Sequence, residues 1–217
     1  MITFEQFLQR FCKKAKIQPA LSKEELTTFV RNNFFNLCKN GIINGTYLKR
    51  YRSQFERIGV LYNKNNYMAS YLEDNKKLCI FVEDTAILAI EKNSIVYCKN
   101  GYISIADNVV ARCENSSVIC HDNSKINADW CDTINLFDNS EAIITHCSCV
   151  EAEDDAKIEL TTCCVAFVLG NVTVDARDAC YIQAQDNVNI TASNHTCIIA
   201  KDNVKIEADE TCLIKRV

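Results

Sequence analysis

Proline and glycine are scarce in this sequence, with one proline and five glycines among 217 residues. This scarcity excludes collagen-like and low-complexity chains, which are rich in these residues. Apolar runs near the ~20 residues of a membrane-spanning helix are also missing. The N-terminal stretch MITFEQFLQRFCKKAKI mixes charged residues with apolar ones, whereas a secretory signal needs a continuous apolar segment. We therefore expect a cytoplasmic protein that does not associate with membranes.

The spacing C-x-x-C, which is typical of metal-binding and redox sites, is absent although the chain has fourteen cysteines. Cysteine packs as a small hydrophobe and is often buried. We therefore expect reduced cysteines that fill a protein core, with no metal and no cofactor. Disulfides or a metal site are the alternative.

The formal net charge of −4 conceals two regions of opposite sign. Residues 1–75 contain twelve Lys and Arg against six Asp and Glu, which gives +6. Residues 76–217 contain twelve against twenty-two, which gives −10. We therefore predict two domains with these boundaries, a helical cap module at 1–75 and a repeat domain at 76–217.

Helical periodicity is clear near the N-terminus. Apolar residues recur at helical spacing over 4–15, with Thr3 as the expected N-cap, and again over 26–37. The second of these segments follows SKEE, in which Ser22 and Glu25 match a capping box. Two amphipathic helices are therefore predicted.

A third helix is predicted with Thr46 as its N-cap and Gly59 at its end, followed by short strands at 60–63 and 67–72. Its outer face is basic and carries Lys49, Arg50, Arg52 and Arg57. Two helices, a turn and a basic helix resemble a helix-turn-helix, so nucleic-acid binding is one hypothesis. The connection Lys39–Gly45 is longer than the three or four residues of that motif, so a solvated basic face is the simpler interpretation.

The remainder of the chain repeats itself every sixteen residues. Six blocks run from 122 to 217 without an insertion: DNSKINADWCDTINLF, DNSEAIITHCSCVEAE, DDAKIELTTCCVAFVL, GNVTVDARDACYIQAQ, DNVNITASNHTCIIAK and DNVKIEADETCLIKRV. Blocks one residue shorter begin at 92 and 107, and a degenerate block begins at 76. Self-similarity at a fixed period indicates a repeat architecture.

Each block contains two segments in which every second residue is small or apolar, such as Val188, Ile190 and Ala192. This alternation predicts strands, and Asp-Asn or Gly-Asn pairs predict the turns between them. Because one such coil cannot bury its apolar side alone, we expect coils to stack with parallel strands ~4.8 Å apart. The prediction is a mainly β protein: a flat two-sheet parallel β-solenoid of about nine 15–16-residue coils with an N-terminal α-helical cap module.

Residues sixteen apart are expected to lie above one another in columns. An acidic column is predicted at the first turn of each block, with a gap at Gly170, and consists of Asp122, Asp138, Asp154, Asp186 and Asp202. At the second turn, a cysteine column is predicted beside a mixed one: Cys131, Cys147 and Cys163 beside Trp130, His146 and Thr162. Stacked thiols near a histidine could hold a soft metal or form a disulfide. A turn position that tolerates cysteine is the simpler interpretation, because structural zinc needs four ligands around a point.

The end coils of a solenoid expose unpaired strand edges that invite another chain. The helical module is expected to cover the first coil. For the last predicted coil two outcomes stay open: the charges of Lys215 and Arg216 protect the edge, or two such edges pair in a homodimer. The predicted dimer edge is Cys212, Leu213, Ile214, Lys215 and Arg216.

The stretch YRSQFERIGVLYNKNNYMASYL, followed by octads rich in Asp and Asn, resembles uncharacterised β-solenoid repeat proteins of phages and mobile elements of gut Bacteroidetes. The shared motif is F-x-x-x-G-V-x-x-N, here Phe55 to Asn63, ahead of runs similar to DNAxVxA. The resemblance covers about residues 50–217. It implies the repeat fold and favours a partner in the host machinery, but it implies no activity.

Three functional hypotheses follow. The first is a non-enzymatic scaffold for protein–protein interaction, whose acidic residues imitate nucleic-acid phosphates and inhibit a basic nucleic-acid-binding host protein. The second is nucleic-acid binding by the basic third helix. The third is a carbohydrate-active enzyme on a β-helix, but coils without insertions provide no groove wall for paired carboxylates. The three histidines, His121, His146 and His195, fall on separate coils, so no catalytic residue is predicted.

Overall fold

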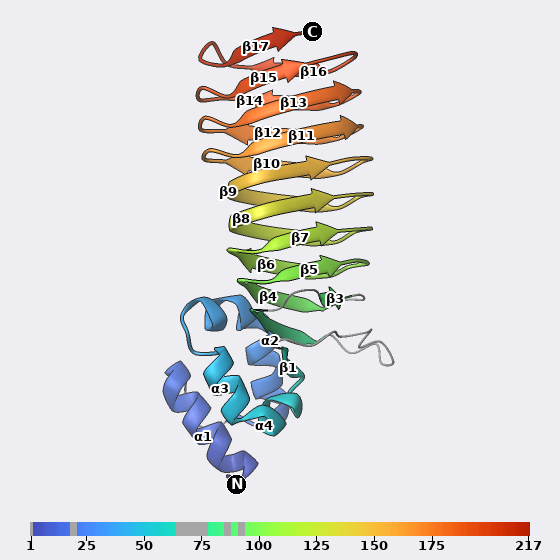
Figure 1. Ribbon diagram of the computed structural model, residues 1–217. Coiled ribbons are helices and arrows are strands. Elements are labelled where there is room, and N and C mark those ends of the chain that lie inside the picture. The colour runs from blue at the N-terminus through green and yellow to red at the C-terminus, as the bar shows by residue number, and fades with distance from the viewer. Residues whose placement is uncertain (1, 18–20, 64–77, 85–87, 91–93) are drawn as a thin grey trace.

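The computed structural model describes residues 2–17, 21–63, 78–84, 88–90 and 94–217 and is mainly β (Figure 1). The helices are α1 (Phe4–Ala15), α2 (Lys23–Lys39), α3 (Gly45–Arg50) and α4 (Arg52–Glu56). The strands are β1 (Val60–Asn63), β2 (Cys79–Glu83), β3 (Leu88–Ile90), β4 (Ile95–Lys99), β5 (Tyr102–Ile105), β6 (Val110–Glu114), β7 (Ser117–Cys120), β8 (Lys125–Leu136), β9 (Glu141–Ala152), β10 (Lys157–Thr161), β11 (Val165–Gly170), β12 (Thr173–Arg177), β13 (Tyr181–Asp186), β14 (Asn189–Ala192), β15 (Cys197–Ala200), β16 (Lys205–Ala208) and β17 (Leu213–Arg216). None of the described helices has the length and apolar character needed to cross a membrane.

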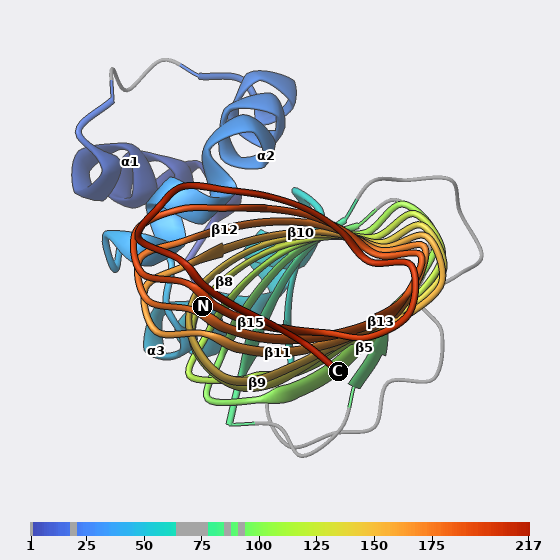
Figure 2. The same cartoon turned by 90° about the horizontal axis from the view of Figure 1, so that it is seen from above.

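Strands pair in parallel with the equivalent strand of the next coil. Thr173 in β12 lies opposite Asn189 in β14, and Asn189 lies opposite Lys205 in β16, a step of sixteen residues each time. The chain thus winds into a solenoid of about eight turns, which is a flattened ring when viewed along its axis (Figure 2). The predicted parallel β-solenoid is confirmed. The first predicted coil, 76–91, lies partly outside the described residues.

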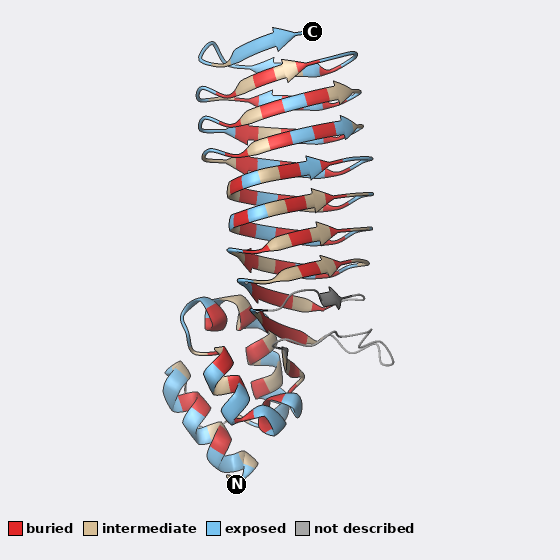
Figure 3. Ribbon diagram, in the orientation of Figure 1, coloured by how far each residue is buried: buried red, intermediate tan, exposed pale blue. Residues whose placement is uncertain are grey.

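Buried residues alternate with more exposed ones along the strands from β5 to β15, as the colour bands in Figure 3 show. In β12, for example, Val174 and Ala176 are buried whereas Thr173 is exposed. The buried cluster of the described coils consists of Ile, Val, Leu, Ala and Cys and contains no aromatic residue. Opposed sheets lie only ~10 Å apart, which suits small and branched side chains better than rings.

The helices form a second, aromatic core at the N-terminal end of the solenoid (Figure 1). Phe7 and Phe55 meet edge to face, with their ring centroids 5.0 Å apart. This core also includes Phe81 of β2 and Tyr97 of β4, and β1 pairs with β2 in parallel. The helical module is therefore attached to the first coils by side-chain packing and by a strand. The predicted boundary between residues 75 and 76 falls outside the described residues.

The first two helix caps are confirmed, because Thr3 and Ser22 each form a complete capping box. The prediction of Thr46 as the third N-cap is wrong. Asn44 caps α3 instead, since its side chain accepts the Tyr47 N–H at 2.9 Å and also donates to the Gly41 carbonyl. The single third helix is also wrong: Tyr51 leaves helical geometry (φ −122°, ψ 32°) and separates α3 from α4. The predicted strand 67–72 lies outside the described residues.

Ile143 and Ile144 are adjacent in β9 but have 45% and 0% of their surfaces exposed. Ile144→Ala should lower the free energy of unfolding by about 2–5 kcal/mol, because it leaves a cavity in the solenoid. The matched control Ile143→Ala should lower it by about 1 kcal/mol or less. Urea denaturation measures both values, and equal losses would contradict the alternation of inward and outward residues.

Candidate functional site

The first corner of each coil, where a block begins, is built on aspartate. Its backbone has positive φ, between 55° and 69°, at Asp107, Asp122, Asp138, Asp154, Asp186 and Asp202. We call these six residues the Asp column. Asp tolerates this left-handed conformation better than most residues because its short side chain bonds to nearby backbone. The predicted acidic column is therefore in place, and it has one more member than predicted.

The carboxylates of the Asp column also connect neighbouring coils. The Asp107 N–H donates to Asp122 Oδ2 at 3.3 Å, and the Asp122 N–H donates to Asp138 Oδ2 at 3.1 Å. The Asp138 N–H donates in the same way to Asp154 at 3.3 Å. Each bonded carboxylate thus satisfies a backbone donor that faces no strand partner at the corner. The column has a structural role, while Asp122, Asp138 and Asp154 remain exposed.

Gly170 interrupts the Asp column for a steric reason. Its φ is 88°, and a Cβ atom at this position would lie 3.2 Å from both the N and the O atoms of Asp154. Asp107, the additional member, begins the motif DNV that also begins the blocks at 186 and 202. That motif was the signal that could have identified it.

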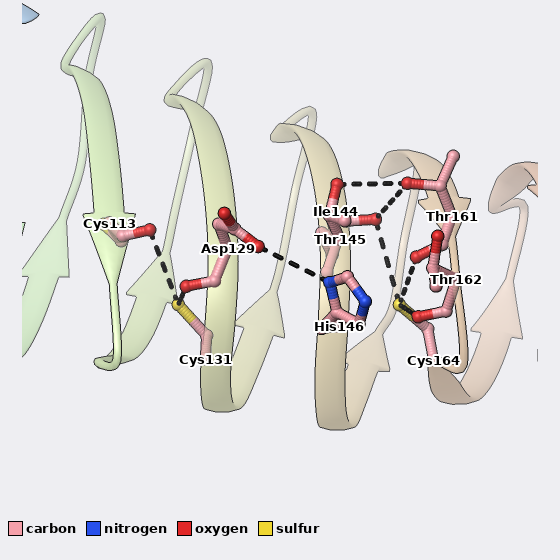
Figure 4. Close-up of polar contacts among 9 residues, drawn as sticks. All are labelled: Cys113, Asp129, Cys131, Ile144, Thr145, His146, Thr161, Thr162 and Cys164. Carbon is pink, nitrogen blue, oxygen red and sulfur yellow. Dashed lines mark hydrogen bonds and ion pairs between the residues drawn. The ribbon is translucent and has the colours of Figure 1, made fainter. Parts of the chain in front are cut away.

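The second corner, in the middle of each coil, has a different column of left-handed residues. Their φ values lie between 48° and 62° at Asn100, Asn115, Trp130, His146, Thr162, Asp178 and Asn194. The Trp130 and His146 rings are stacked, with centroids 4.2 Å apart and 3° between their planes. His146 Nδ1 lies 3.6 Å from Asp129 Oδ1 (Figure 4). The predicted stacking of Trp130 beside His146 is confirmed.

The predicted cysteine column is correct only in part. Cys131 and Cys147 lie opposite each other in β8 and β9 and are buried. Cys163 is exposed, because Thr162 and Cys163 are both left-handed and the corner therefore takes up one more residue. Its neighbour Cys164 is buried, with its Sγ 3.8 Å from the Ile144 carbonyl oxygen (Figure 4).

All fourteen cysteines are free thiols. Within the described parts of the chain, no three His, Cys, Asp or Glu side chains are grouped so that they could hold a metal ion. The inner thiols of the second corner contact backbone carbonyls instead, as Cys131 Sγ does with the Cys113 oxygen at 3.8 Å (Figure 4). Cysteine therefore fills the narrow corner and also gives these buried backbone carbonyls a weak hydrogen-bond donor.

The predicted basic face is divided by the break between α3 and α4. Arg52 pairs with Glu56 at 2.9 Å, and Arg57 lies over the Phe4 ring. A hollow gathers four cations, Arg10, Lys49, Arg50 and Arg52, around Tyr51. Arg10, which donates to the Tyr51 hydroxyl at 3.0 Å, comes from α1 and could not be assigned to this hollow from its position in the sequence.

The predicted dimer edge lies on the last coil (Figure 1). Leu213 and Ile214 have 69% and 43% of their surfaces exposed. β17 pairs with β15, and within the described residues no strand pairs with its other side. Arg216 Nη1 donates to the Val204 carbonyl at 3.1 Å, so this cation turns back over the coil end.

Comparisons of the chain with protein-family models, with curated proteins and with solved structures find no match.

Thiol labelling tests the placement of the cysteines at the second corner. Burial raises the pKa of the Cys131 thiol to about 11 and that of Cys147 to about 12, and the thiolate is the reactive form. At neutral pH, iodoacetamide should therefore modify Cys163 in the folded protein and reach Cys131 and Cys147 only after unfolding. Mass spectrometry of the peptides measures the order, and rapid native labelling of Cys131 would contradict the structure.

Proposed function

We propose that the protein is a non-enzymatic scaffold that binds another protein along the solenoid. The observation that carries the proposal is the unbroken register of the coils. Six successive blocks of sixteen residues have no insertion, so their equivalent exposed side chains follow one another in columns along the solenoid. Such surfaces suit an extended contact with a partner.

The charge of the solenoid favours a basic partner. The repeat domain has a formal charge of −10, from twelve Lys and Arg against twenty-two Asp and Glu. Coils follow one another at ~4.8 Å, whereas phosphates follow one another at 3.4 Å along each strand of duplex DNA. The Asp column therefore has a linear charge density of the same order. We propose that it imitates nucleic acid and inhibits a basic nucleic-acid-binding protein of the host, in agreement with the resemblance to proteins of phages and mobile elements.

Nucleic-acid binding by the helical module is a second candidate. The hollow that gathers Arg10, Lys49, Arg50 and Arg52 favours it. The pairing of Arg52 with Glu56 counts against it, since one carboxylate lies among the cations.

Replacement of five members of the Asp column by asparagine tests the scaffold: Asp122, Asp138, Asp154, Asp186 and Asp202. Asn tolerates the left-handed corner and keeps an acceptor oxygen, so the fold should persist. Basic proteins captured from an extract of the cells that carry the gene should be retained about tenfold less by this variant, and salt should weaken the capture. Quantitative mass spectrometry compares the eluates.

The matched control removes charge of the opposite sign, through Lys49→Ala, Arg50→Ala and Arg52→Ala together. This variant should capture the same proteins as the natural chain. Equal capture by the Asp column variant would contradict mimicry, and capture of nucleic acid that only the Lys49, Arg50 and Arg52 variant loses would support the second candidate.

We also propose a homodimer through the last coil, because Leu213 and Ile214 expose apolar surface beside an unpaired strand edge. Sedimentation equilibrium should show a dimer that Ile214→Lys converts to a monomer through repulsion at the edge. Phe167→Lys, a control at an exposed apolar position of β11, should remain dimeric. A natural chain that is monomeric at every concentration would contradict the proposal.

A further inference from the structure

Trp130 departs from the rule of its own column. Four left-handed positions of the second corner hold Asn or Asp, and Trp130, His146 and Thr162 lie between them: Asn100 and Asn115 come before, and Asp178 and Asn194 come after. Trp130 adopts the same conformation, with φ 55°. A left-handed backbone costs roughly 1–2 kcal/mol for residues other than Gly, Asn and Asp, and a bulky residue there is a true outlier. The left-handed conformation of Trp130 therefore lowers the free energy of unfolding of the chain.

The indole of Trp130 is exposed and yet held in one orientation. Trp130 has 63% of its surface exposed. The ring is parallel to that of His146 at 4.2 Å, and His146 Nδ1 faces Asp129 Oδ1 at 3.6 Å. Tryptophan is the residue most enriched in the energetic centres of protein interfaces. A fixed orientation reduces the entropy that binding would cost.

Carboxylates lie near this corner on two successive coils. Asp129 precedes Trp130 in β8, and Glu114 of β6 lies opposite Asp129 in the register of the sheet. Glu114 is 3.6 Å from Arg112, and Asp132 is exposed two residues beyond the tryptophan. Arg112 offsets one of these three carboxylates, and the remaining negative charge repels phosphate groups and attracts a cation.

We propose that Trp130, with His146 and Asp129, is a docking site for an arginine side chain of a protein partner. A guanidinium is planar, stacks on aromatic rings and forms paired hydrogen bonds with a carboxylate. This site offers an aromatic ring and a carboxylate side by side. The inference rests on the proposed function in one respect, that the occupant belongs to a protein. It adds a second contact edge, separate from the Asp column at the first corner.

The chain contains a single tryptophan, so its fluorescence reports directly on this corner. The probe is a short peptide with three arginines, and the control peptide has citrulline, which is neutral and of nearly the same shape, at the same positions. The arginine peptide should change the Trp130 fluorescence saturably, and the citrulline peptide should not. Asp129→Asn should weaken the binding about fivefold. No saturable change up to millimolar peptide, or equal binding of both peptides, would overturn the proposal.

Trp130→Asn separates binding from folding, because it restores the residue type of Asn115. Its melting temperature should be equal to or above that of the natural chain, whereas calorimetry should detect no binding of the arginine peptide. Phe167→Ala, which removes another exposed apolar side chain, should bind normally. Retained binding by Trp130→Asn would overturn the site.

The same variant distinguishes this site from the scaffold proposal when it is used in the capture experiment. Loss of captured partner with Trp130→Asn supports the docking site. Full capture with Trp130→Asn, together with loss in the Asp column variant, overturns the docking site and leaves the scaffold standing. Peptide binding without any captured protein supports the arginine site and counts against the scaffold.

Discussion

The stacking of each strand on the equivalent strand of the next coil is the interaction on which the rest of the structure depends. Its hydrogen bonds run between coils, as from the Asn189 N–H to the Val172 carbonyl at 3.0 Å, so no coil is stable without its neighbours. The register places each side chain above its counterpart one coil earlier. The narrow interior, the columns at both corners and the attachment of the helical module through β1 all follow from this arrangement.

Stacking also decides which residues are free to serve function. Inward positions must be small or branched, and thiols such as that of Cys164 suit the corner because they contact backbone carbonyls. Carboxylates of the Asp column accept hydrogen bonds from backbone N–H groups of the preceding coil, but their charge stays at the surface. Trp130 and Thr162 are two positions at which the second corner departs from the Asn and Asp that a left-handed backbone prefers, and such departures are expected where function competes with stability.

Most of the fold could be predicted from the sequence, because one period determines strand, turn and column together. The period could not reveal a local change in corner geometry. Thr162 and Cys163 are both left-handed, which exposes Cys163 although its column places it above the buried Cys147. The cap of α3 was missed because Asn44 and Thr46 are both good N-caps and only the three-dimensional loop decides between them. No local pattern in the sequence reveals contacts between coils or between helices. Two examples are the approach of Asp129 to His146 and the position of Arg10 in the same hollow as Lys49.

Thermal unfolding of a chain that lacks one complete coil tests whether the stacking of equivalent strands determines the fold. Deletion of residues 170–185 joins Leu169 to Asp186 and brings β10 and β11 against β14 and β15 in the same register. We expect this shortened chain to unfold cooperatively and to have a β-type far-ultraviolet circular dichroism spectrum. Deletion of 170–177 alone removes half a coil, including β12. It should abolish cooperative unfolding, because every later strand would then lie on the opposite sheet of the solenoid. Loss of the fold after the sixteen-residue deletion, or equal folding of both deletions, would show that stacking of equivalent strands does not determine the fold.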